Sequence, residues 1–488
     1  MPLPFADITA RCRIAQVAWA ALPLDERLRP VRRLRHGIAE HAERLALTAT
    51  QDVGRAADEV LATDVLPTAD ACRFLEKHAE RVLRPRRVPR SQRPLWLIGN
   101  RETVYRRPFG VVGVIGTWNY PILLNAVPIV QALVAGNGVV WKPSELAATS
   151  GAFLHELFIA AGFPGGLFAL LPATRRAGPE LAEADVDHVI FTGSANVGRK
   201  LATRLGERLI PSTLELSGCD ALFVLDDADV PMAAMAAWYG ATLNAGQTCL
   251  AVRRVFVHRS RYADFLERLR PLAATAQPEL LALMGQAEQA EELVREAIAA
   301  GAQLLGDHSP TAADDPPRFA PTVVCDARPD MSICREASFA PLLAVIPFDD
   351  EAGLEAAAEA CPFGLATSVF TADAGRGAAL AARLRVGAVV VNDVIVPTAH
   401  PSVPFGGVRQ SGWGVTRGTE GLLGMTVPQV VSVRKGTFRP HYAGAANPSN
   451  ADIVRGLLAW NHAAGRRDRW GGLRRLVRGL MGAAKGKK

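Results

Sequence analysis

Cys249 stands in a sequence context that raises the question of nucleophilic chemistry. It belongs to the stretch "LNAGQTCLA" (243–251), a small polar turn in which Gly, Gln and Thr precede the thiol. A thiolate is a strong nucleophile, but most free cysteines are small buried core residues. The turn alone is compatible with both interpretations, so the neighbouring motifs must decide between them.

Two further side chains have the chemistry that a nucleophilic cysteine needs. Glu215 lies inside the apolar run "TLELSG" (213–218), where a carboxylate needs a partner or a raised pKa, and a pKa near neutrality suits a general base. Asn119, in "TWNYP" (117–121), directly follows an apolar run that is typical of a buried strand. Its amide is placed to donate a hydrogen bond to a developing oxyanion.

Three strands are predicted to end at Gly116, Lys142 and Gly193, and open parallel sheets bind ligands at that edge. The turn "GSANVG" (193–198) could hold a pyrophosphate on backbone N–H groups, although an ordinary tight β–α turn has the same pattern. In "KPSE" (142–145), Lys and Glu suit ribose hydroxyls, and isolated surface charges are the alternative.

The elements that position these residues form two α/β units. Residues 5–83 have helical periodicity, and from residue 110 Val/Ile-rich strands alternate with helices, a pattern typical of parallel sheets covered on both faces. The second unit begins near residues 215–220. Pro128 lies inside the helix predicted for 121–136 and predicts a kink or a restart there.

The composition is that of a globular intracellular protein, with 49% hydrophobic and 21% charged residues, and we expect a cytoplasmic location. There is no apolar run long enough for a spanning helix and no signal-peptide pattern at the start. The seven cysteines show no CxxC or His-rich spacing, so neither a disulfide framework nor a metal site is predicted.

The net charge of +7 belongs to the C-terminal segment. Residues 451–488 hold ten Lys/Arg and two Asp, whereas the rest of the chain holds 45 basic and 46 acidic residues. We therefore expect no nucleic-acid partner. Trp470, Leu473, Val477 and Leu480 fall on one helical face, which predicts a basic amphipathic helix at a membrane surface. Packing against the protein body or a second subunit is the alternative.

Together these motifs resemble the aldehyde dehydrogenase superfamily over residues 5–440. The stretches that carry the resemblance are "PFGVVGVIGTWNYP", "GNGVVWKPSE", "FTGSANVGRK", "LEL", "NAGQTC", "FAPTVV", "PFGLATSVFT" and "PFGGVRQSGWG". The short N-terminus, "NDV" with the following His400, and the C-terminal extension are most similar to the class 3, fatty-aldehyde-type branch.

The resemblance implies two Rossmann-like doubly wound domains and a small β arm for oligomerisation, most simply in a homodimer. The implied boundaries are 1–85 with 108–218 for the dinucleotide-binding domain, 219–421 for the catalytic domain, 86–107 with 422–438 for the arm, and 439–488 for a linker and tail. The implied arm pairs "RETVYRRPFG" with a segment near 425–435.

The resemblance also implies a mechanism. Cys249 would attack the aldehyde, Asn119 and the Cys249 backbone N–H would hold the oxyanion, and Glu215 would activate water to hydrolyse the thioester. The product would be a carboxylate, from a substrate expected to be a hydrophobic fatty or aromatic aldehyde. The cofactor would be NAD, with NADP as the alternative.

The residues that the resemblance assigns to this cofactor are Lys142 and Glu145 at the adenosine ribose, Gly193, Ser194 and Gly198 at the pyrophosphate, and Trp118 and Phe339 beside the nicotinamide. The sequence departs from the family at the usual nicotinamide-ribose Glu, which is Ala337 here, with Glu336 one position early. The usual Leu-Gly-Gly-Lys reads Leu-Ser217-Gly-Cys219, and Cys219 is a rival nucleophile on composition alone.

These departures keep two other functions open. The first is a largely inactive family member that binds dinucleotide or acts structurally, which the intact Asn119, Glu215 and Cys249 disfavour. The second is an acyl-thioester reductase, in which a hydrolytic base such as Glu215 would be undesirable.

Overall fold

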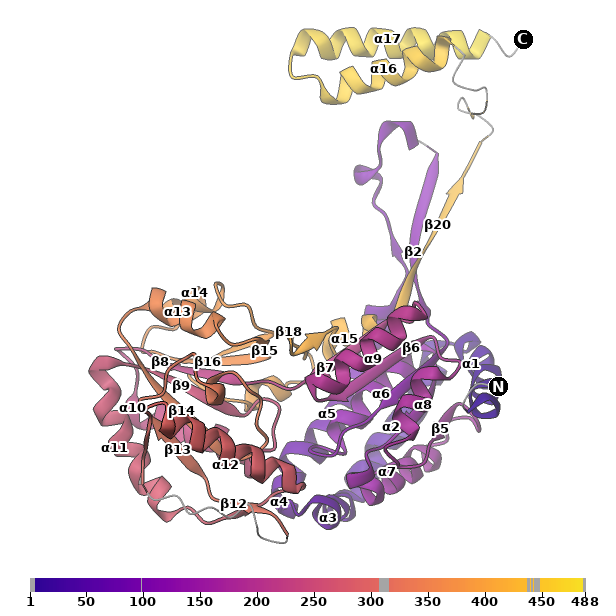
Figure 1. Ribbon diagram of the computed structural model, residues 1–488. Helices are drawn as coiled ribbons and strands as arrows, with labels where there is room; N and C mark the ends of the chain where they lie inside the picture. Colours follow the sequence, from indigo (N-terminus) through magenta and orange to yellow (C-terminus); the bar gives the residue numbers. More distant parts are fainter. Residues whose placement is uncertain are drawn as a thin grey trace. The chain divides into compact units, whose positions relative to one another are not determined.

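The computed structural model describes residues 5–97, 99–306, 316–436, 439, 442 and 448–485 (Figure 1). Contacts divide the chain into a larger unit, Met1–Leu83 with Arg107–Val427, and a smaller unit, Arg84–Arg106 with Pro428–Lys488. The linker expected after residue 439 lies largely outside the described residues. Both α/β sheets, and with them all of the candidate catalytic residues, belong to the larger unit.

The first sheet has the strand order β19-β7-β6-β3-β4-β5. Its members are β3 (Val111–Ile115), β4 (Gly138–Lys142), β5 (Phe168–Leu170), β6 (His188–Gly193), β7 (Ser212–Leu216) and β19 (Gly412–Trp413). All neighbours are parallel except β19, which is antiparallel to β7. The segment expected to be the catalytic domain, 219–421, thus contributes an edge strand to the first sheet.

Helices cover both faces of this sheet. Alternate side chains of a strand point to opposite faces, so each strand contributes to the core on both sides. Val112 and Val114 of β3 pack into one core cluster, whereas Val111 and Ile115 pack into another. The helices that contact its strands are α1 (Ala6–Ala21), α6 (Leu123–Ala135), α8 (Ala177–Glu183) and α9 (Ala195–Glu207). Helices α2 (Leu24–Glu40), α3 (Ala42–Val53), α5 (Leu66–Leu83) and α7 (Ala148–Ala160) pack against one another or against α6. Pro128 lies within one continuous helix α6, so the predicted restart does not occur.

The second sheet has the order β11-β13-β14-β9-β8-β16-β17. Its strands are β8 (Asp220–Val224), β9 (Val252–His258), β11 (Gln303–Leu304), β13 (Thr322–Cys325), β14 (Leu342–Phe348), β16 (Ala366–Phe370) and β17 (Ala388–Val391). Only β11 runs antiparallel. The accompanying helices are α10 (Val230–Thr242), α11 (Arg259–Thr275), α12 (Met284–Ala299), α13 (Glu351–Glu359) and α14 (Ala374–Ala381), and they are seen around this sheet in Figure 1.

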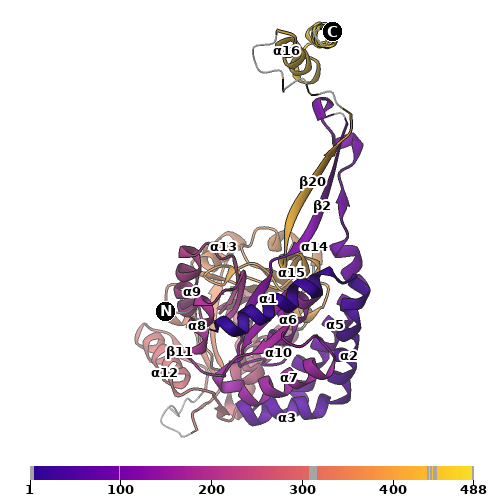
Figure 2. The same ribbon diagram turned by 90° about the vertical axis from the view of Figure 1, so that its right-hand side faces the viewer.

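The smaller unit contains the long β arm. Strand β2 (Asn100–Pro108) pairs with β20 (Thr426–Arg434) and with the short β1 (Arg86–Arg87), which is the pairing expected for "RETVYRRPFG". Figure 2 shows β2 and β20 running side by side. In β20, Val427, Val430, Val431 and Val433 are all exposed. A strand with many exposed valines leaves apolar surface for a partner.

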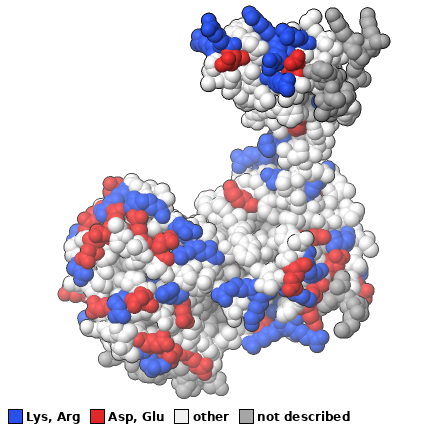
Figure 3. Space-filling model, turned by 45° about the horizontal axis from the view of Figure 1, so that its top comes forward, with Lys and Arg blue, Asp and Glu red and all other residues white. Residues whose placement is uncertain are grey.

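The same unit also contains two helices, α16 (Pro448–His462) and α17 (Arg466–Lys485), which pack closely as a hairpin. The approach depends on glycines: a Cβ on Gly456 would lie 2.7 Å from the Cα of Leu476, and one on Gly472 would lie 2.5 Å from the backbone nitrogen of Trp460. Figure 3 shows Lys and Arg gathered on the hairpin, whereas charges of both signs alternate on the larger unit. Among the described residues, no helix is long and apolar enough to cross a bilayer.

Candidate active site

Seven of the predicted site residues line one cavity of about 240 Å³ in the larger unit. These are Trp118, Asn119, Gly193, Ser194, Glu215, Cys249 and Phe339. The cavity lies at the carboxyl ends of strands β3, β6 and β7, the edge at which open parallel sheets bind ligands. Lys142, Glu145 and Gly198 do not line it.

Cys249 is carried by a tight turn with unusual backbone geometry. Asn244, Ala245 and Gly246 all have positive φ angles, of 54°, 52° and 69°. A Cβ on Gly246 would lie 2.4 Å from the carbonyl of Ala340, so only glycine fits at this position. The left-handed turn therefore fixes where the chain leaves helix α10 and where the thiol emerges.

Side chains hold this turn in place. The side chain of Gln247 accepts a hydrogen bond from the backbone nitrogen of Ala282 at 2.9 Å. The hydroxyls of Thr248 and Tyr120 lie 2.7 Å apart, and the buried Arg253 donates to the carbonyls of both Ala340 and Gly246. Each contact secures a residue next to the nucleophile. The residues of "NAGQT" therefore hold Cys249 in its position.

Cys249 is the only cysteine of the seven that is not fully buried. Burial, Asp220 and Glu215 raise the pKa of its thiol to about 12, whereas the charge of Arg417 lowers it. The rival candidate, Cys219, is buried, does not line the cavity, and directs its sulfur to the carbonyl of Cys334 at 3.7 Å. The geometry thus favours Cys249 as the reactive thiol.

Glu215 is buried in strand β7, with 5% of its surface exposed. Its Oε1 accepts a hydrogen bond of 3.2 Å from the hydroxyl of Thr416, whereas its Oε2 is buried without a hydrogen-bond partner among the described residues. Burial raises its pKa to about 8, and the nearby Arg417 and Thr416 oppose that rise. A carboxyl group with this pKa can exchange a proton near neutral pH.

Asn119 is positioned through both its side chain and its backbone. The hydroxyl of Thr117 donates to Oδ1 at 2.9 Å, which sets the amide orientation, and Nδ2 donates to the carbonyl of Gln247 at 3.0 Å. An amide nitrogen has two hydrogens, so one N–H of Asn119 is left for the cavity.

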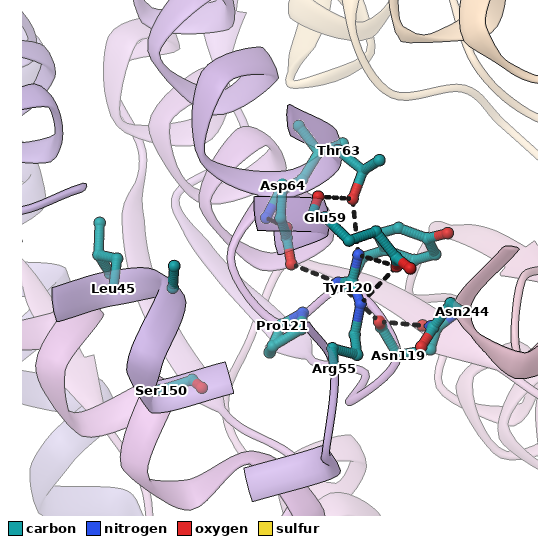
Figure 4. A network of polar contacts seen from close by, with 12 residues as sticks. Leu45, Arg55, Glu59, Thr63, Asp64, Asn119, Tyr120, Pro121, Ser150 and Asn244 are labelled. Atoms are coloured by element: carbon teal, nitrogen blue, oxygen red, sulfur yellow. Dashed lines mark hydrogen bonds and ion pairs between the residues drawn. The ribbon is translucent and has the colours of Figure 1, made fainter. Parts of the chain in front are cut away.

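The carbonyl of Asn119 belongs to a buried network that sequence analysis missed (Figure 4). Arg55 donates to this carbonyl at 3.2 Å and pairs with Asp64, on the short π-helix Leu61–Val65, at 3.1 Å. Asn244, from the cysteine turn, donates to the same carbonyl at 3.1 Å. The loop that holds Asn119 is therefore linked both to the helical layer and to the turn before Cys249.

The two aromatic residues predicted to lie beside the nicotinamide, Trp118 and Phe339, are in contact with each other. The rings of Trp118 and Phe339 meet edge to face, with centroids 6.0 Å apart. Ala337 lines the cavity, whereas Glu336 is exposed and accepts a hydrogen bond of 3.3 Å from Gln289 of helix α12. The carboxylate one position early thus reaches the cavity wall only through Gln289.

The residues predicted for the phosphate and ribose have separate roles in the structure. Ser194 caps helix α9 by accepting a hydrogen bond from Val197 N at 3.3 Å, and it lines the cavity together with Gly193. A Cβ on Gly198 would lie 2.6 Å from the side chain of Leu216, so this glycine allows the helix to pack on the sheet. Lys142 donates to Glu145 at 3.1 Å, and Arg175 holds the other carboxylate oxygen at 2.9 Å.

A second cavity of about 100 Å³ also reaches Cys249. Its wall is mostly apolar and includes Leu123, Leu243, Leu250, Ile395, Val396 and Phe405. Arg417 also lines it, a residue that sequence analysis missed although Thr416 and Arg417 follow the quoted motif "PFGGVRQSGWG" almost directly. Cys249 therefore has one polar cavity at the sheet edge and one apolar cavity beside it.

Comparisons with known proteins identify the family of this chain. A family model described as "Aldehyde dehydrogenase family" matches residues 5–431. A 4,4'-diapolycopene aldehyde oxidase from Methylomonas sp is 36% identical over 426 residues, which cover 86% of this chain and 79% of that protein. A betaine aldehyde dehydrogenase from Agrobacterium fabrum is 35% identical, with 83% of each protein covered.

Solved structures give the same result. An aldehyde dehydrogenase of Mycobacterium tuberculosis in complex with NAD+ matches with a TM-score of 0.82 and 29% identity, covering 90% of this chain and 92% of that one. The NAD+ complex of an aldehyde dehydrogenase from Bacillus cereus matches with a TM-score of 0.81 and 29% identity, covering 88% and 89%. The chain belongs to the aldehyde dehydrogenase family.

Proposed function

We propose that this protein oxidises a hydrophobic aldehyde to its carboxylate, with Cys249 as nucleophile, Asn119 as oxyanion donor and Glu215 as general base. The observation that carries the proposal is the position of Cys249, which borders both the sheet-edge cavity and the apolar cavity. One side of the thiol can then face a dinucleotide while the other faces the aldehyde. The apolar wall of the second cavity favours fatty or aromatic aldehydes.

The sheet-edge cavity fits a dinucleotide. It combines the N-terminus of helix α9, capped by Ser194, with the aromatic pair of Trp118 and Phe339. Bound there, the nicotinamide would supply a hydride acceptor. We propose NAD as the preferred cofactor because two structural neighbours of this chain were solved in complex with NAD+.

The chain's own residues account for the other steps. The thiol of Cys249 loses its proton to solvent, a loss that burial opposes and the charge of Arg417 favours, and the thiolate forms a C–S bond to the aldehyde carbon and leaves an oxyanion. The free N–H of Asn119 and the backbone N–H of Cys249 hold that oxyanion, which collapses to a thioester once the carbon has lost its hydride. Glu215 then takes a proton from water while the water oxygen forms a C–O bond to the thioester carbon, the C–S bond breaks to regenerate the thiolate, and the carboxylate leaves.

The test is formation of reduced nicotinamide by the purified full-length protein, with NAD or NADP and a panel from short to long-chain and aromatic aldehydes. The Cys249→Ser variant should lose turnover, whereas Cys72→Ala, which changes a buried thiol of helix α5, should retain it. Equal turnover by the Cys249→Ser variant, or none by the wild type with any aldehyde, would overturn the proposal.

We also propose a homodimer that forms through the β arm. Strand β20 is at the edge of its sheet, and Val427, Val430 and Val433 are exposed on it. An edge strand of this kind is a template for pairing with another chain. The Val430→Lys variant should be monomeric by light scattering where the wild type is dimeric, and a monomeric wild type would contradict the proposal.

The hairpin of α16 and α17 is proposed to contact anionic membrane surfaces. Trp470, Val477 and Met481 are exposed by 61%, 48% and 59%, and Arg474 and Arg478 are exposed on the same helix. Exposed apolar residues together with arginines suit an interface with acidic lipid. Co-sedimentation with anionic liposomes at low salt should occur and should fall in Trp470→Ala. A protein that stays in solution would refute the contact.

A further inference from the structure

The second, mostly apolar cavity beside Cys249 is lined by one cationic side chain, Arg417, which has no ion-pair partner among the described residues. Arg417 is buried, with 5% of its surface exposed, and its side chain donates to the carbonyl of Thr398 at 2.6 Å. Within the described residues, no carboxylate forms an ion pair with it. By contrast, the buried guanidinium of Arg55 is paired with both Asp64 and Glu59.

The carboxyl group of Glu215 interacts electrostatically with Arg417, but it does not cancel the charge of Arg417 at neutral pH. Burial raises the pKa of Glu215 to about 8, so its carboxyl group is mostly protonated at pH 7. Arg417 itself lies above the ring of Phe405, with its guanidinium carbon 4.3 Å from the ring centroid. The cavity wall therefore carries a net positive charge beside the nucleophile.

Of the three aromatic rings that line this cavity, those of Tyr120 and Phe405 each have one face covered by a guanidinium group, whereas that of Tyr239 has none over it among the described residues. A quaternary ammonium group binds to proteins through the faces of aromatic rings. In this cavity, Arg417 covers a face of Phe405 and Arg55 covers a face of Tyr120, the latter also at 4.3 Å from the ring centroid. The two guanidinium groups thus occupy ring faces that would stabilise such a ligand.

On this basis we propose that Arg417 is a specificity-determining residue that excludes cationic aldehydes. The inference rests on the proposed function and names the substrate class of the same site. It separates this chain from relatives named as betaine aldehyde dehydrogenases, whose named substrate has a quaternary ammonium group. The wall of Leu123, Leu243 and Leu250 then accommodates a neutral apolar chain.

The test compares aldehydes of equal shape and different charge. Betaine aldehyde and 3,3-dimethylbutanal differ only by nitrogen in place of carbon, and so by one positive charge. For the wild type, kcat/KM for the neutral member should exceed that for the cation by at least about 30-fold, as expected for like charges within one cavity of intermediate dielectric. A wild-type preference for the cationic aldehyde would overturn the proposal.

Variants at the same position isolate the charge. Arg417→Met should reduce the neutral-to-cation ratio by at least about tenfold, whereas Arg417→Lys, which retains the charge, should retain most of the ratio. Comparison of ratios between variants cancels the different hydration of the two aldehydes and any general loss of activity. An unchanged ratio in the Met variant would show that Arg417 does not set the specificity.

A second measurement does not depend on turnover. Cys249 is the one cysteine that is partly exposed, so its rate of modification by methanethiosulfonates reports on the charge of its surroundings. With NADH present and Cys249→Ser as the blank, the sulfonate reagent should outpace the trimethylammonium reagent in the wild type and lose that advantage in Arg417→Met. Equal rates in the wild type would overturn the charge argument even if aldehydes are oxidised, and charge-selective modification without any aldehyde turnover would refute only the proposed function.

Discussion

The hydroxyl of Thr416 donates a hydrogen bond of 3.2 Å to Oε1 of Glu215, and it comes from the segment that follows edge strand β19. Because β19 pairs with β7, the strand that carries Glu215, a residue 201 positions away in the sequence reaches the candidate base. The other carboxylate oxygen of Glu215 is buried without a hydrogen-bond partner among the described residues. The Thr416 hydroxyl is therefore expected to set how easily Glu215 ionises.

Thr416→Val should raise the pKa of Glu215 further, because it removes a hydrogen bond that favours the charged form. A hydrogen bond to a charged group contributes about 1.5–3 kcal/mol, which corresponds to about one to two pH units. The midpoint of the pH–rate profile for aldehyde oxidation should move upward by that amount, whereas Thr416→Ser should leave it in place. A midpoint that does not move would mean that Thr416 does not tune the base.

The pH dependence of the wild type should follow the ionisation of Glu215. Burial raises its pKa to about 8, so the fraction of active carboxylate rises with pH and levels off above that value. Glu215→Gln should still form the thioester but not hydrolyse it, which would give a single burst of reduced nicotinamide equal to the enzyme concentration. Multiple turnovers by this variant would exclude Glu215 as the essential base.

The same shift makes a prediction for stability, with a definite sign. The folded state holds the proton of Glu215 until about pH 8, whereas the unfolded state releases it near the ordinary value of 4.5. Stability should therefore fall as pH rises between these values, by about 1.4 kcal/mol per unit at most. Glu215→Gln has no carboxyl group to ionise and lacks this loss. The melting temperature of the variant minus that of the wild type should therefore be larger at pH 8 than at pH 5. A difference that does not depend on pH would contradict the assignment.

Arg55 should support both folding and catalysis through Asn119. Arg55→Met leaves Asp64 as a fully buried acid without its cation, a change that typically costs about 3–5 kcal/mol. It also removes the donor to the Asn119 carbonyl, so kcat should fall together with the free energy of unfolding. Adding Asp64→Asn to Arg55→Met should recover part of the stability, since no charge then remains unpaired.

The matched control for Arg55 is Arg32→Met, which breaks an ion pair between an exposed arginine and Glu76. Exposed pairs contribute about 0–1 kcal/mol, so this variant should have nearly wild-type stability and kcat. Chemical denaturation and steady-state kinetics measure both quantities. A stability loss in Arg55→Met no larger than that of Arg32→Met would show that the buried network is not important.

The sequence was sufficient for the parts of this molecule that local pattern determines. Val/Ile-rich runs predicted the strands, and the residue types of Asn119, Glu215 and Cys249 predicted a site that lines one cavity. It was insufficient where a side chain's partner comes from a distant element. Thr416 and Arg417 act on Glu215 only because β19 joins the first sheet, and no periodicity in residues 408–417 indicates that pairing.

Burial was the other quantity that the sequence could not supply. Arg55 follows a glycine at the end of helix α3 and has the sequence context of an exposed arginine, yet it is 4% exposed and paired with Asp64. The role of Lys142 and Glu145 at the adenosine ribose stays a prediction: the two side chains are hydrogen-bonded to each other and lie outside the cavity.

Gly246 provides a last test of how the turn before Cys249 is built. Gly246→Ala combines two penalties: a positive φ of 69°, and a Cβ placed 2.4 Å from the Ala340 carbonyl. Gly301→Ala isolates the first penalty, because Gly301 has a φ of +98° but a Cβ added there would meet no atom of the described residues within 4 Å. The Gly301 variant should lose only about 1–2 kcal/mol of stability and keep its kcat. The Gly246 variant should lose more stability and also most of its kcat, because relief of the clash must displace the backbone that carries the nucleophile. Equal effects of the two substitutions in denaturation and kinetic measurements would mean that the close approach to Ala340 does not position Cys249.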